Sequence, residues 1–321
     1  MFVGGTLRSG ENMVKIFMKD PWKDDAFPPM KIRGFIDLLR PFTLLAPLIG
    51  GLCGAILGAK SGDFKNFDLL QLIYGVGTLV LINAASNALN QVTDLDIDKI
   101  NKPYRPIPSK IVSVNEALAI AAVLYLFALF RAFLISITFF GFVALIIGIT
   151  MGYSLPPLRF KKRLIVSNIS IATGRGLLGF VAAWVIFGYV WNPLPWLLGT
   201  ILFVYLVGTA TTKDFTDING DKKYGINTLP IIYGTKKSAL LTIPFFILPF
   251  LLIPLIAFMG YIKVESVYLA VILIIWGIYT SVHMARYATT PDSKFENTPA
   301  WKNMYLMLLT FQVGFCLIYL F

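Results

Sequence analysis

Two stretches of the chain bring carboxylates and cations together in the same order. In the first, residues 90–110, Asn90, Asp94 and Asp98 are spaced so that all three fall along one face of a helix. Like charges stacked on one face repel each other, so the arrangement is a poor structural device. Carboxylate and carboxamide oxygens are, however, good ligands for a hard cation such as Mg2+. The spacing therefore predicts a magnesium site on this face.

Basic residues follow this acidic face at once. Lys102 and Arg105 stand among the prolines Pro103, Pro106 and Pro108. Prolines at this density interrupt any helix and hold the neighbouring side chains in an irregular loop. A metal-binding face beside a basic loop suits an anionic phosphate ligand.

The second stretch, residues 213–230, repeats this order. Asp214, Asp217 and Asp221 again share one helical face, and two lysines follow. Either stretch alone is explained equally well as an ordinary charged loop. Two matched stretches instead predict a diphosphate that is bridged by Mg2+ and held between them.

The elements that must position these residues are membrane helices. Of the 321 residues, 57% are hydrophobic and only 14% are charged, which predicts an all-α, polytopic membrane bundle. We expect about nine transmembrane helices. The predicted spans are 38–59, 69–92, 115–131, 133–153, 165–189, 194–212, 238–259, 265–285 and 301–320.

The distribution of Lys and Arg predicts the orientation. The N-terminal segment and the even-numbered loops between the spans contain 23 basic residues, whereas the odd-numbered loops contain 4. This is a positive-inside pattern with a cytoplasmic N-terminus. Both acidic stretches then lie on the cytoplasmic side. The basic cytoplasmic loops also account for the net charge of +11, which needs no nucleic-acid partner. We expect a multi-pass protein of the cell membrane, with residues 1–34 as a partly disordered cytoplasmic segment and residues 35–321 as one transmembrane domain.

Two further features add candidate substrate contacts. Arg175 lies inside the fifth predicted span, where a charge is costly and therefore predicts a function, unless the side chain snorkels to the interface. The loop YSLPPLRFKKR begins at Tyr153 and offers Arg159 and Lys161 as phosphate contacts. The alternative role for this loop is anchoring on the cytoplasmic side.

These motifs, in this order, resemble those of the UbiA superfamily of intramembrane prenyltransferases. The matching segments are NxxxDxxxD from Asn90, DKINKPYRPIPS, YSLPPLRFK and DxxDxxxD from Asp214. The resemblance implies a nine-helix bundle in which two Asp motifs hold Mg2+ on an isoprenyl diphosphate. It also implies a lipophilic acceptor, such as a small aromatic acid, a quinone precursor, a tetrapyrrole or a glycerol-lipid alcohol.

Different segments of the chain resemble different branches of the family. Gln91 and the segment IATGRGLL are similar to the homogentisate-type branch, whereas DKINKPYRPIPS is closer to chlorophyll synthases and archaeal geranylgeranylglyceryl phosphate prenyltransferases. Thr211 and Thr212 occupy the place of the Arg–Glu pair expected in the archaeal lipid enzymes. We therefore expect an aromatic or quinone-precursor acceptor, with geranylgeranylglyceryl phosphate or a tetrapyrrole as the alternative.

The charges and the resemblance together suggest a role for each candidate. The expected Mg2+ ligands are Asp94, Asp98, Asp214, Asp217 and Asp221. Asn90 would orient the metal or contact the phosphate. The expected contacts to diphosphate oxygens are Lys102, Arg105, Arg159 and Lys161.

The remaining candidates concern the reacting carbon and the acceptor. Tyr153 would stabilise the allylic cation or donate a hydrogen bond, and Arg175 would bind an anionic group of the acceptor. Two other protein classes fit the sequence less well. A CDP-alcohol phosphotransferase requires a DG-x2-AR segment that the chain lacks, and a transporter would carry more polar groups at mid-membrane than Arg175.

Overall fold

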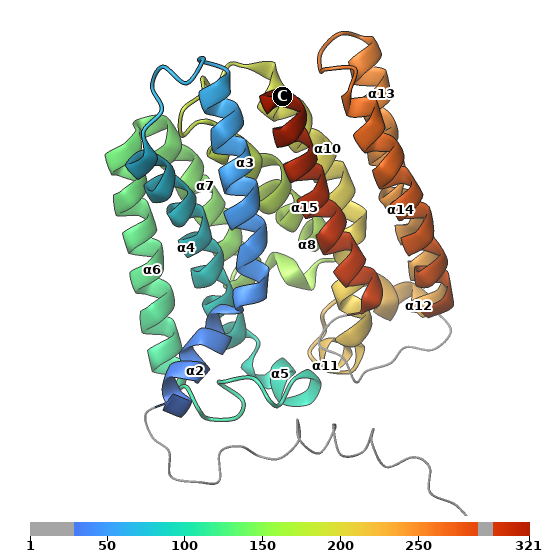
Figure 1. Ribbon diagram of the computed structural model, residues 1–321. Helices are drawn as coiled ribbons and strands as arrows, with labels where there is room; N and C mark the ends of the chain where they lie inside the picture. The colour runs from blue at the N-terminus through green and yellow to red at the C-terminus, as the bar shows by residue number, and fades with distance from the viewer. Residues whose placement is uncertain (1–28, 288–297) are drawn as a thin grey trace, which may run out of the picture.

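The computed structural model describes residues 29–287 and 298–321, and in these ranges it contains helices and no strand. The long helices run side by side in one bundle (Figure 1). This confirms the all-α membrane bundle. Most of the predicted N-terminal segment, residues 1–34, lies outside the described residues, and its last residues begin helix α2 (Pro29–Leu39).

Nine helical segments of the described ranges are long and apolar enough to cross a membrane, as predicted. Several consist of more than one helix. In chain order the segments are η1 (Pro41–Leu44) with α3 (Leu45–Lys60), α4 (Leu69–Thr93), α6 (Val114–Ile135), α7 (Ile137–Ser154), α8 (Leu164–Ile171) with η3 (Ala172–Leu177) and α9 (Leu178–Trp184), α10 (Pro193–Thr209) with η4 (Ala210–Thr216), α12 (Leu229–Thr242) with η5 (Ile243–Phe246) and α13 (Leu248–Phe258), α14 (Ser266–Tyr287) and α15 (Pro299–Leu320).

The break between the third and fourth spans differs from the prediction. The predicted spans 115–131 and 133–153 meet next to Arg131, but α6 continues to Ile135 and the chain breaks at Ser136, whose side chain caps α7. Arg131 is accommodated within α6. Its guanidinium lies 4.3 Å from the centroid of the Tyr74 ring and donates a hydrogen bond to the Tyr74 carbonyl at 2.9 Å.

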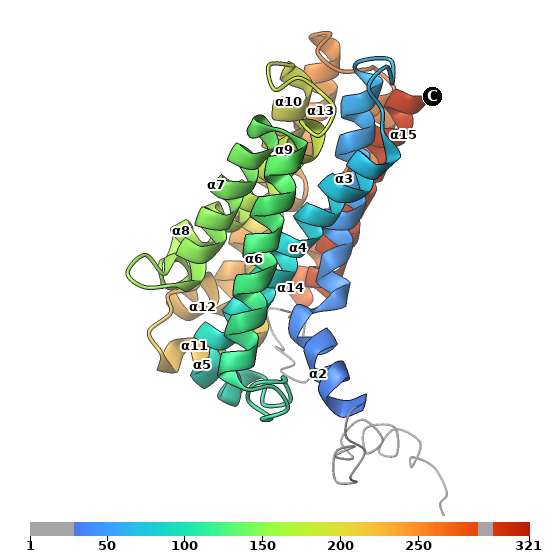
Figure 2. The ribbon, with the colours of Figure 1, turned by 90° about the vertical axis from the view of Figure 1, so that its left-hand side faces the viewer.

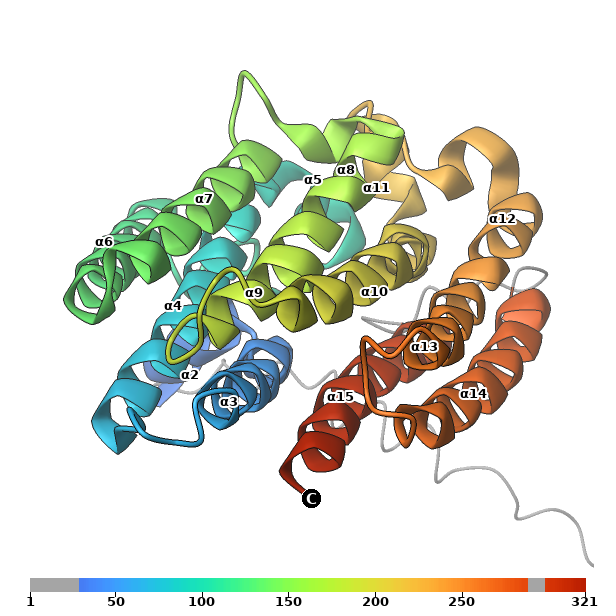
Figure 3. The ribbon, with the colours of Figure 1, turned by 90° about the horizontal axis from the view of Figure 1, so that it is seen from above.

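Seen from above, α12 to α15 form one side of the bundle, α3, α4, α6 and α7 form the other, and α8 to α10 lie between them (Figure 3). Helix α3 contacts α4, α9 and α15, whereas α10 packs against η3. The second and sixth spans, which carry the two acidic stretches, therefore belong to neighbouring parts of one bundle.

Each acidic stretch contains a break in its helix. Helix α4 ends before Asp94, and the short helix α5 (Leu95–Asn101) follows; η4 ends before Asp217, and α11 (Ile218–Lys223) follows. Both aspartates have non-helical backbone angles, with φ of −106° and −109°. The prediction that each motif lies on one continuous helical face is therefore wrong, because the helix ends at the middle of the motif.

Helices α5 and α11 lie side by side at one end of the bundle (Figures 1 and 2). The side chain of Asn101 joins them. Its Nδ2 donates to the carbonyl of Asp217 at 2.9 Å, and its Oδ1 accepts from the N–H of Gly220 at 2.8 Å. This bridge fixes the two broken helix ends against each other and so brings the two acidic motifs together.

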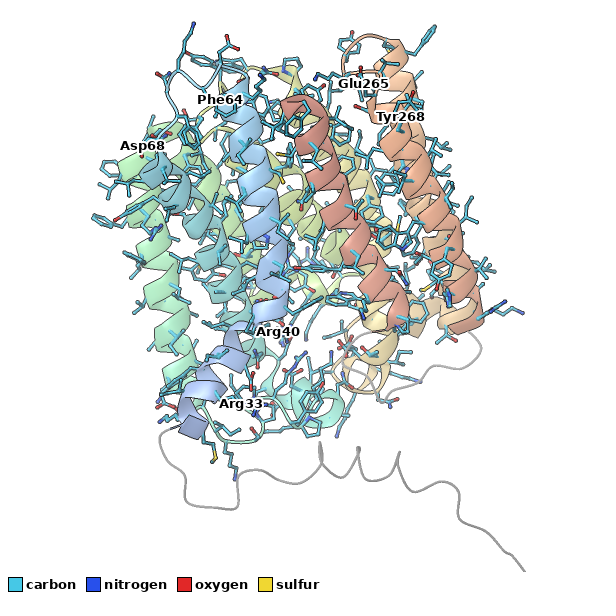
Figure 4. The ribbon with its side chains drawn as sticks, in the orientation of Figure 1. Arg33, Arg40, Phe64, Asp68, Glu265 and Tyr268 are labelled. Atoms are coloured by element: carbon cyan, nitrogen blue, oxygen red, sulfur yellow. The ribbon has the colours of Figure 1, made fainter. Side chains whose placement is uncertain are left out.

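We propose that this end of the bundle faces the cytoplasm, because the basic segments gather there. Arg33 and Arg40 lie at the end that carries α5 and α11, and Asp68 and Glu265 lie at the opposite end (Figure 4). The positive-inside rule orients basic loops toward the cytoplasm.

Labelling of introduced cysteines tests this orientation. Cysteines that replace the exposed Lys99 and Lys222 should react with an impermeant thiol reagent only from the cytoplasmic side, and one that replaces Tyr189 only from the other side. The native Cys53 and Cys316 are both buried and should stay silent. Labelling of Lys99→Cys and Lys222→Cys from opposite sides would contradict the fold itself.

Candidate active site

The two acidic motifs meet in one large cavity of about 760 Å3. Its walls come from the ends of α4 and η4, from α5 and α11, and from the spans above them. Eleven of the twelve residues predicted from the sequence line it. They are Asn90, Asp94, Asp98, Lys102, Arg105, Tyr153, Lys161, Arg175, Asp214, Asp217 and Asp221.

Arg159 is the exception. Its Nη2 donates a hydrogen bond to the carbonyl of Thr93 at 3.0 Å, and it lies 4.0 Å from Asp94 Oδ1. The side chain thus binds the end of α4 and is not among the residues that line the cavity. The structure favours a positioning role for Arg159 over the predicted phosphate contact.

Cations of the first motif's loop bind both motifs. Lys102 Nζ lies 2.8 Å from Asp217 Oδ1, so that it bridges the first stretch to the second. Arg105 Nη1 lies 2.7 Å from both carboxylate oxygens of Asp98. Asp98, Lys102 and Arg105 are buried and Asp217 is partly buried, and charge-assisted hydrogen bonds are stronger in such surroundings than in water.

The other carboxylates have their own partners. Lys161 forms an ion pair with Asp94, and Asn90 Nδ2 donates to Asp94 Oδ2 at 2.8 Å. Lys213 Nζ lies 3.3 Å from Asp214 Oδ1. Each of these aspartates is therefore next to a cation in the cavity. The partners come from α4, the loop after α5, the loop after α7 and η4.

Burial leaves these charges incompletely compensated. It raises the pKa of Asp221 to about 7, with further repulsion from Asp217 and Asp214, and it also raises the pKa of Asp98. Burial lowers the pKa of Lys161 to about 7 and also lowers that of Lys102. A bound cation would stabilise these carboxylates, and a bound anion would stabilise the lysines. The site therefore suits a ligand that contains both.

The donor set fits Mg2+ only together with such a ligand. In the described part of the chain, no three carboxylate, His or Cys side chains converge closely enough to hold a metal ion. Mg2+ commonly binds through one or two carboxylates and completes its octahedron with water and phosphate oxygens. The five aspartates can supply the carboxylates, and a diphosphate would supply the phosphate oxygens.

Arg175 reaches the same cavity from inside the bundle. It lies in η3, a π-helical segment, next to Gly176, whose Cα lies so close to α10 that an added Cβ would be 3.0 Å from the Leu202 carbonyl carbon. The side chain is accessible within the cavity, and no described carboxylate pairs with it. Its electrostatic neighbours are the phenols of Tyr125, Tyr153 and Tyr305. The snorkelling alternative is therefore not observed.

The prediction missed two residues that shape the site. Lys213 Nζ donates to Tyr153 Oη at 3.0 Å, which leaves the tyrosine hydroxyl hydrogen free to donate into the cavity. Its position directly before Asp214 was the available signal. Asn101, which joins α5 and α11, carried no signal because its partners are backbone groups distant in sequence.

A model of the UbiA prenyltransferase family matches residues 44–308. The chain belongs to the UbiA prenyltransferase family. It is 32% identical over 286 residues to the digeranylgeranylglyceryl phosphate synthase of Methanosphaera stadtmanae, which covers 88% of this chain and 98% of the relative. It is 33% identical over 214 residues to the synthase of the same name from Thermococcus gammatolerans, with 65% of this chain and 72% of the relative covered.

Solved structures agree with this membership. One concerning a digeranylgeranylglyceryl phosphate synthase in membranes has a TM-score of 0.64 and 27% identity, over 88% of this chain and 98% of that one. A UbiA homologue from Archaeoglobus fulgidus bound to GPP and Mg2+ has a TM-score of 0.71 over 89% of this chain and 99% of that one. At 19% identity, the second likeness shows the shared fold.

The protein is thus a UbiA-family prenyltransferase and a multi-pass membrane protein. The relatives do not favour the expected aromatic acceptor. That expectation drew on Thr211 and Thr212, which are fully buried. They line neither this cavity nor the smaller cavity of about 140 Å3 beside it. Thr211 accepts a hydrogen bond from Asn168, and Thr212 accepts one from Thr298 through its carbonyl. These threonines serve packing and therefore carry no information on the acceptor.

Proposed function

We propose that this protein transfers a geranylgeranyl group from geranylgeranyl diphosphate to geranylgeranylglyceryl phosphate in a Mg2+-dependent reaction. The observation that carries the proposal is the near full-length match to a digeranylgeranylglyceryl phosphate synthase. The convergence of both Asp motifs and several cations in one cavity supports it. The reaction forms a carbon–oxygen ether bond and breaks the bond between the allylic carbon and the diphosphate.

The donor diphosphate would bind between the two motifs. Asp94, Asp98, Asp214, Asp217 and Asp221 would hold Mg2+, with Asn90 orienting Asp94. Bound there, Mg2+ would neutralise charge that develops on the leaving diphosphate. Lys102, Arg105 and Lys161 would exchange their carboxylate partners for diphosphate oxygens.

The acceptor would bring a second anion into the site. Among the described residues, Arg175 forms none of the Asp–cation pairs of this cavity, and it has a planar guanidinium that can bind a phosphate through two hydrogen bonds. This placement suits the phosphate of the acceptor. The acceptor hydroxyl oxygen attacks the allylic carbon and loses its proton, for which the released diphosphate is an available base.

Tyr153 would act at the reacting carbon. Its hydroxyl accepts from Lys213, the residue before Asp214, and its side chain lines the cavity as an electrostatic neighbour of Arg175. The electron-rich face of a tyrosine stabilises a neighbouring positive charge. The apolar spans around the site would keep water from the allylic cation.

Release of pyrophosphate tests the proposed reaction. The purified protein should release it from geranylgeranyl diphosphate only when both Mg2+ and geranylgeranylglyceryl phosphate are present. EDTA should reduce the rate to background, and added Mg2+ should restore it, because the carboxylates alone cannot neutralise a diphosphate. Release that continues unchanged in EDTA would contradict the metal-dependent mechanism.

A further inference from the structure

The chain breaks between α2 and η1 at Arg40 (Figure 4). The Arg40 side chain lines the cavity of about 760 Å3 that holds the candidate active site, which we call the reaction cavity. Its backbone is left-handed, with φ of 53°, a conformation that is uncommon for residues other than glycine. Pro41 follows and has no N–H with which to continue the helix. Such a conformation persists only where neighbouring groups hold it in place.

The break leaves main-chain carbonyls without their helical partners. In a continuous helix the Leu39 carbonyl would accept from the N–H of Thr43, but this N–H donates to the Arg40 carbonyl at 2.9 Å. The Thr43 carbonyl would accept from residue 47, which is Pro47 and has no N–H. Carbonyls that are shielded from water require a donor from elsewhere in the fold.

Three amide side chains of α4 supply such donors, and we call them the amide ladder. They are spaced four residues apart, on one face of the helix. The pairs are Gln91 Nε2 with the Leu38 carbonyl at 2.7 Å, Asn87 Nδ2 with the Leu39 carbonyl at 2.9 Å, and Asn83 Nδ2 with the Thr43 carbonyl at 3.1 Å. The ladder therefore fixes the break against the helix that leads into the first acidic motif.

The fixed break directs a cation toward this motif. Arg40 is an electrostatic neighbour of both Asp98 and Lys102. These two residues take part in the Asp–cation pairs of the reaction cavity. A guanidinium beside them can bind two oxygens of a diphosphate at once. Arg40 would thus add its charge to those of Lys102 and Arg105 when a diphosphate binds.

We propose that Asn87 and Gln91 are positioning residues for the reaction and that they act by holding Arg40 at the diphosphate site of the donor. The proposal rests on the proposed function in that it takes the donor to be an isoprenyl diphosphate. The donor is favoured over the phosphate of the acceptor because the electrostatic neighbours of Arg40 belong to the Asp–cation pairs. A carboxylate at position 87 or 91 could not replace the amide, because it has no hydrogen to donate to a carbonyl.

Substitutions that keep the shape of each amide but remove its donor test this role. Gln91→Met and Asn87→Leu should each weaken binding of the donor about tenfold. Arg40→Gln, which removes the charge itself, should weaken it about 10- to 100-fold. The double variant Arg40→Gln/Gln91→Met should bind within about twofold of Arg40→Gln, because a residue that acts through Arg40 has no further effect once Arg40 is gone.

Gln71 offers a matched control at the other end of α4. Its Nε2 also donates to a main-chain carbonyl, that of Ile186, at 2.5 Å, but it does not line the reaction cavity. Gln71→Met and Gln91→Met should both lower the thermal midpoint of unfolding, because each leaves a carbonyl without its donor. Only Gln91→Met should weaken donor binding. An equal loss of binding in Gln71→Met would overturn the proposal, because the loss would then reflect stability alone.

The measurement is calorimetric binding of geranylgeranyl thiolodiphosphate, a non-hydrolysable donor analogue, in detergent with Mg2+ and without acceptor. Full affinity in both ladder variants, or losses that multiply in the double variant, would overturn the proposal. If Gln91→Met does not fold, Asn87→Leu combined with Arg40→Gln provides the same comparison. Normal binding of the analogue to the wild type without alkylation of geranylgeranylglyceryl phosphate would instead reject the proposed function and leave the positioning role standing.

Discussion

Asp94→Asn and Asp217→Asn should each reduce kcat/KM for the isoprenyl diphosphate by at least about a thousandfold, equivalent to about 4 kcal/mol of transition-state stabilisation. Each carboxylate lies at a helix break at the centre of its motif. Asparagine keeps the shape of the side chain but loses the charge that would bind Mg2+. Turnover at saturating Mg2+ and the thermal midpoint of unfolding in detergent measure the two effects separately.

Asp96→Asn is the matched control for these variants. Asp96 belongs to the same short helix α5, but it is exposed and pairs with Lys99 at 2.8 Å outside the cavity. Such surface pairs contribute little. We expect wild-type turnover from Asp96→Asn. Near-normal turnover of Asp94→Asn or Asp217→Asn would reject the two-motif site.

Arg175→Lys should reduce kcat/KM for geranylgeranylglyceryl phosphate by about 30- to 1000-fold, through loss of a bidentate, charged contact in a low-dielectric site. The loss should appear mainly as a raised KM for the acceptor, while the affinity for the donor stays close to wild type. Lysine keeps the charge but lacks the planar pair of donors. Steady-state kinetics with each substrate varied in turn separate the two parameters.

Arg33→Lys is the control for the loss of a guanidinium, because Arg33 is largely exposed and forms an ion pair with the exposed Asp37. It should leave both KM values unchanged. If Arg175→Lys shows wild-type kinetics for the acceptor, Arg175 has no part in acceptor binding. A raised KM for the donor alone would place the guanidinium on the diphosphate instead.

Much of the fold could be predicted from the sequence because a membrane helix depends on local composition. The nine spans follow from apolar length alone, and their number is confirmed in the part of the chain that the structure describes. The boundary at Arg131 was wrong because a single arginine can be satisfied within a helix when Tyr74 offers its ring and carbonyl. That tertiary partner lies in another span and leaves no trace in the local pattern.

The residues that line the site could also be predicted from the sequence, but the backbone conformation that positions them could not. Asp, Asn, Lys and Arg side chains at regular spacing identified eleven residues that line the cavity. The spacing could not show that the helices end at Asp94 and Asp217, because these breaks are held by the contact of α5 with α11. The role of Lys213 likewise depends on a partner in another helix, Tyr153.

The most direct test of the account is a competition between acceptors, read by mass spectrometry of the products. The purified protein receives geranylgeranyl diphosphate, Mg2+ and equal concentrations of geranylgeranylglyceryl phosphate and 4-hydroxybenzoate. We predict digeranylgeranylglyceryl phosphate as the product, with no prenylated aromatic acid, and no product from Asp217→Asn. Prenylated 4-hydroxybenzoate as the main product would contradict the proposed acceptor, and product from Asp217→Asn at the wild-type rate would contradict the site.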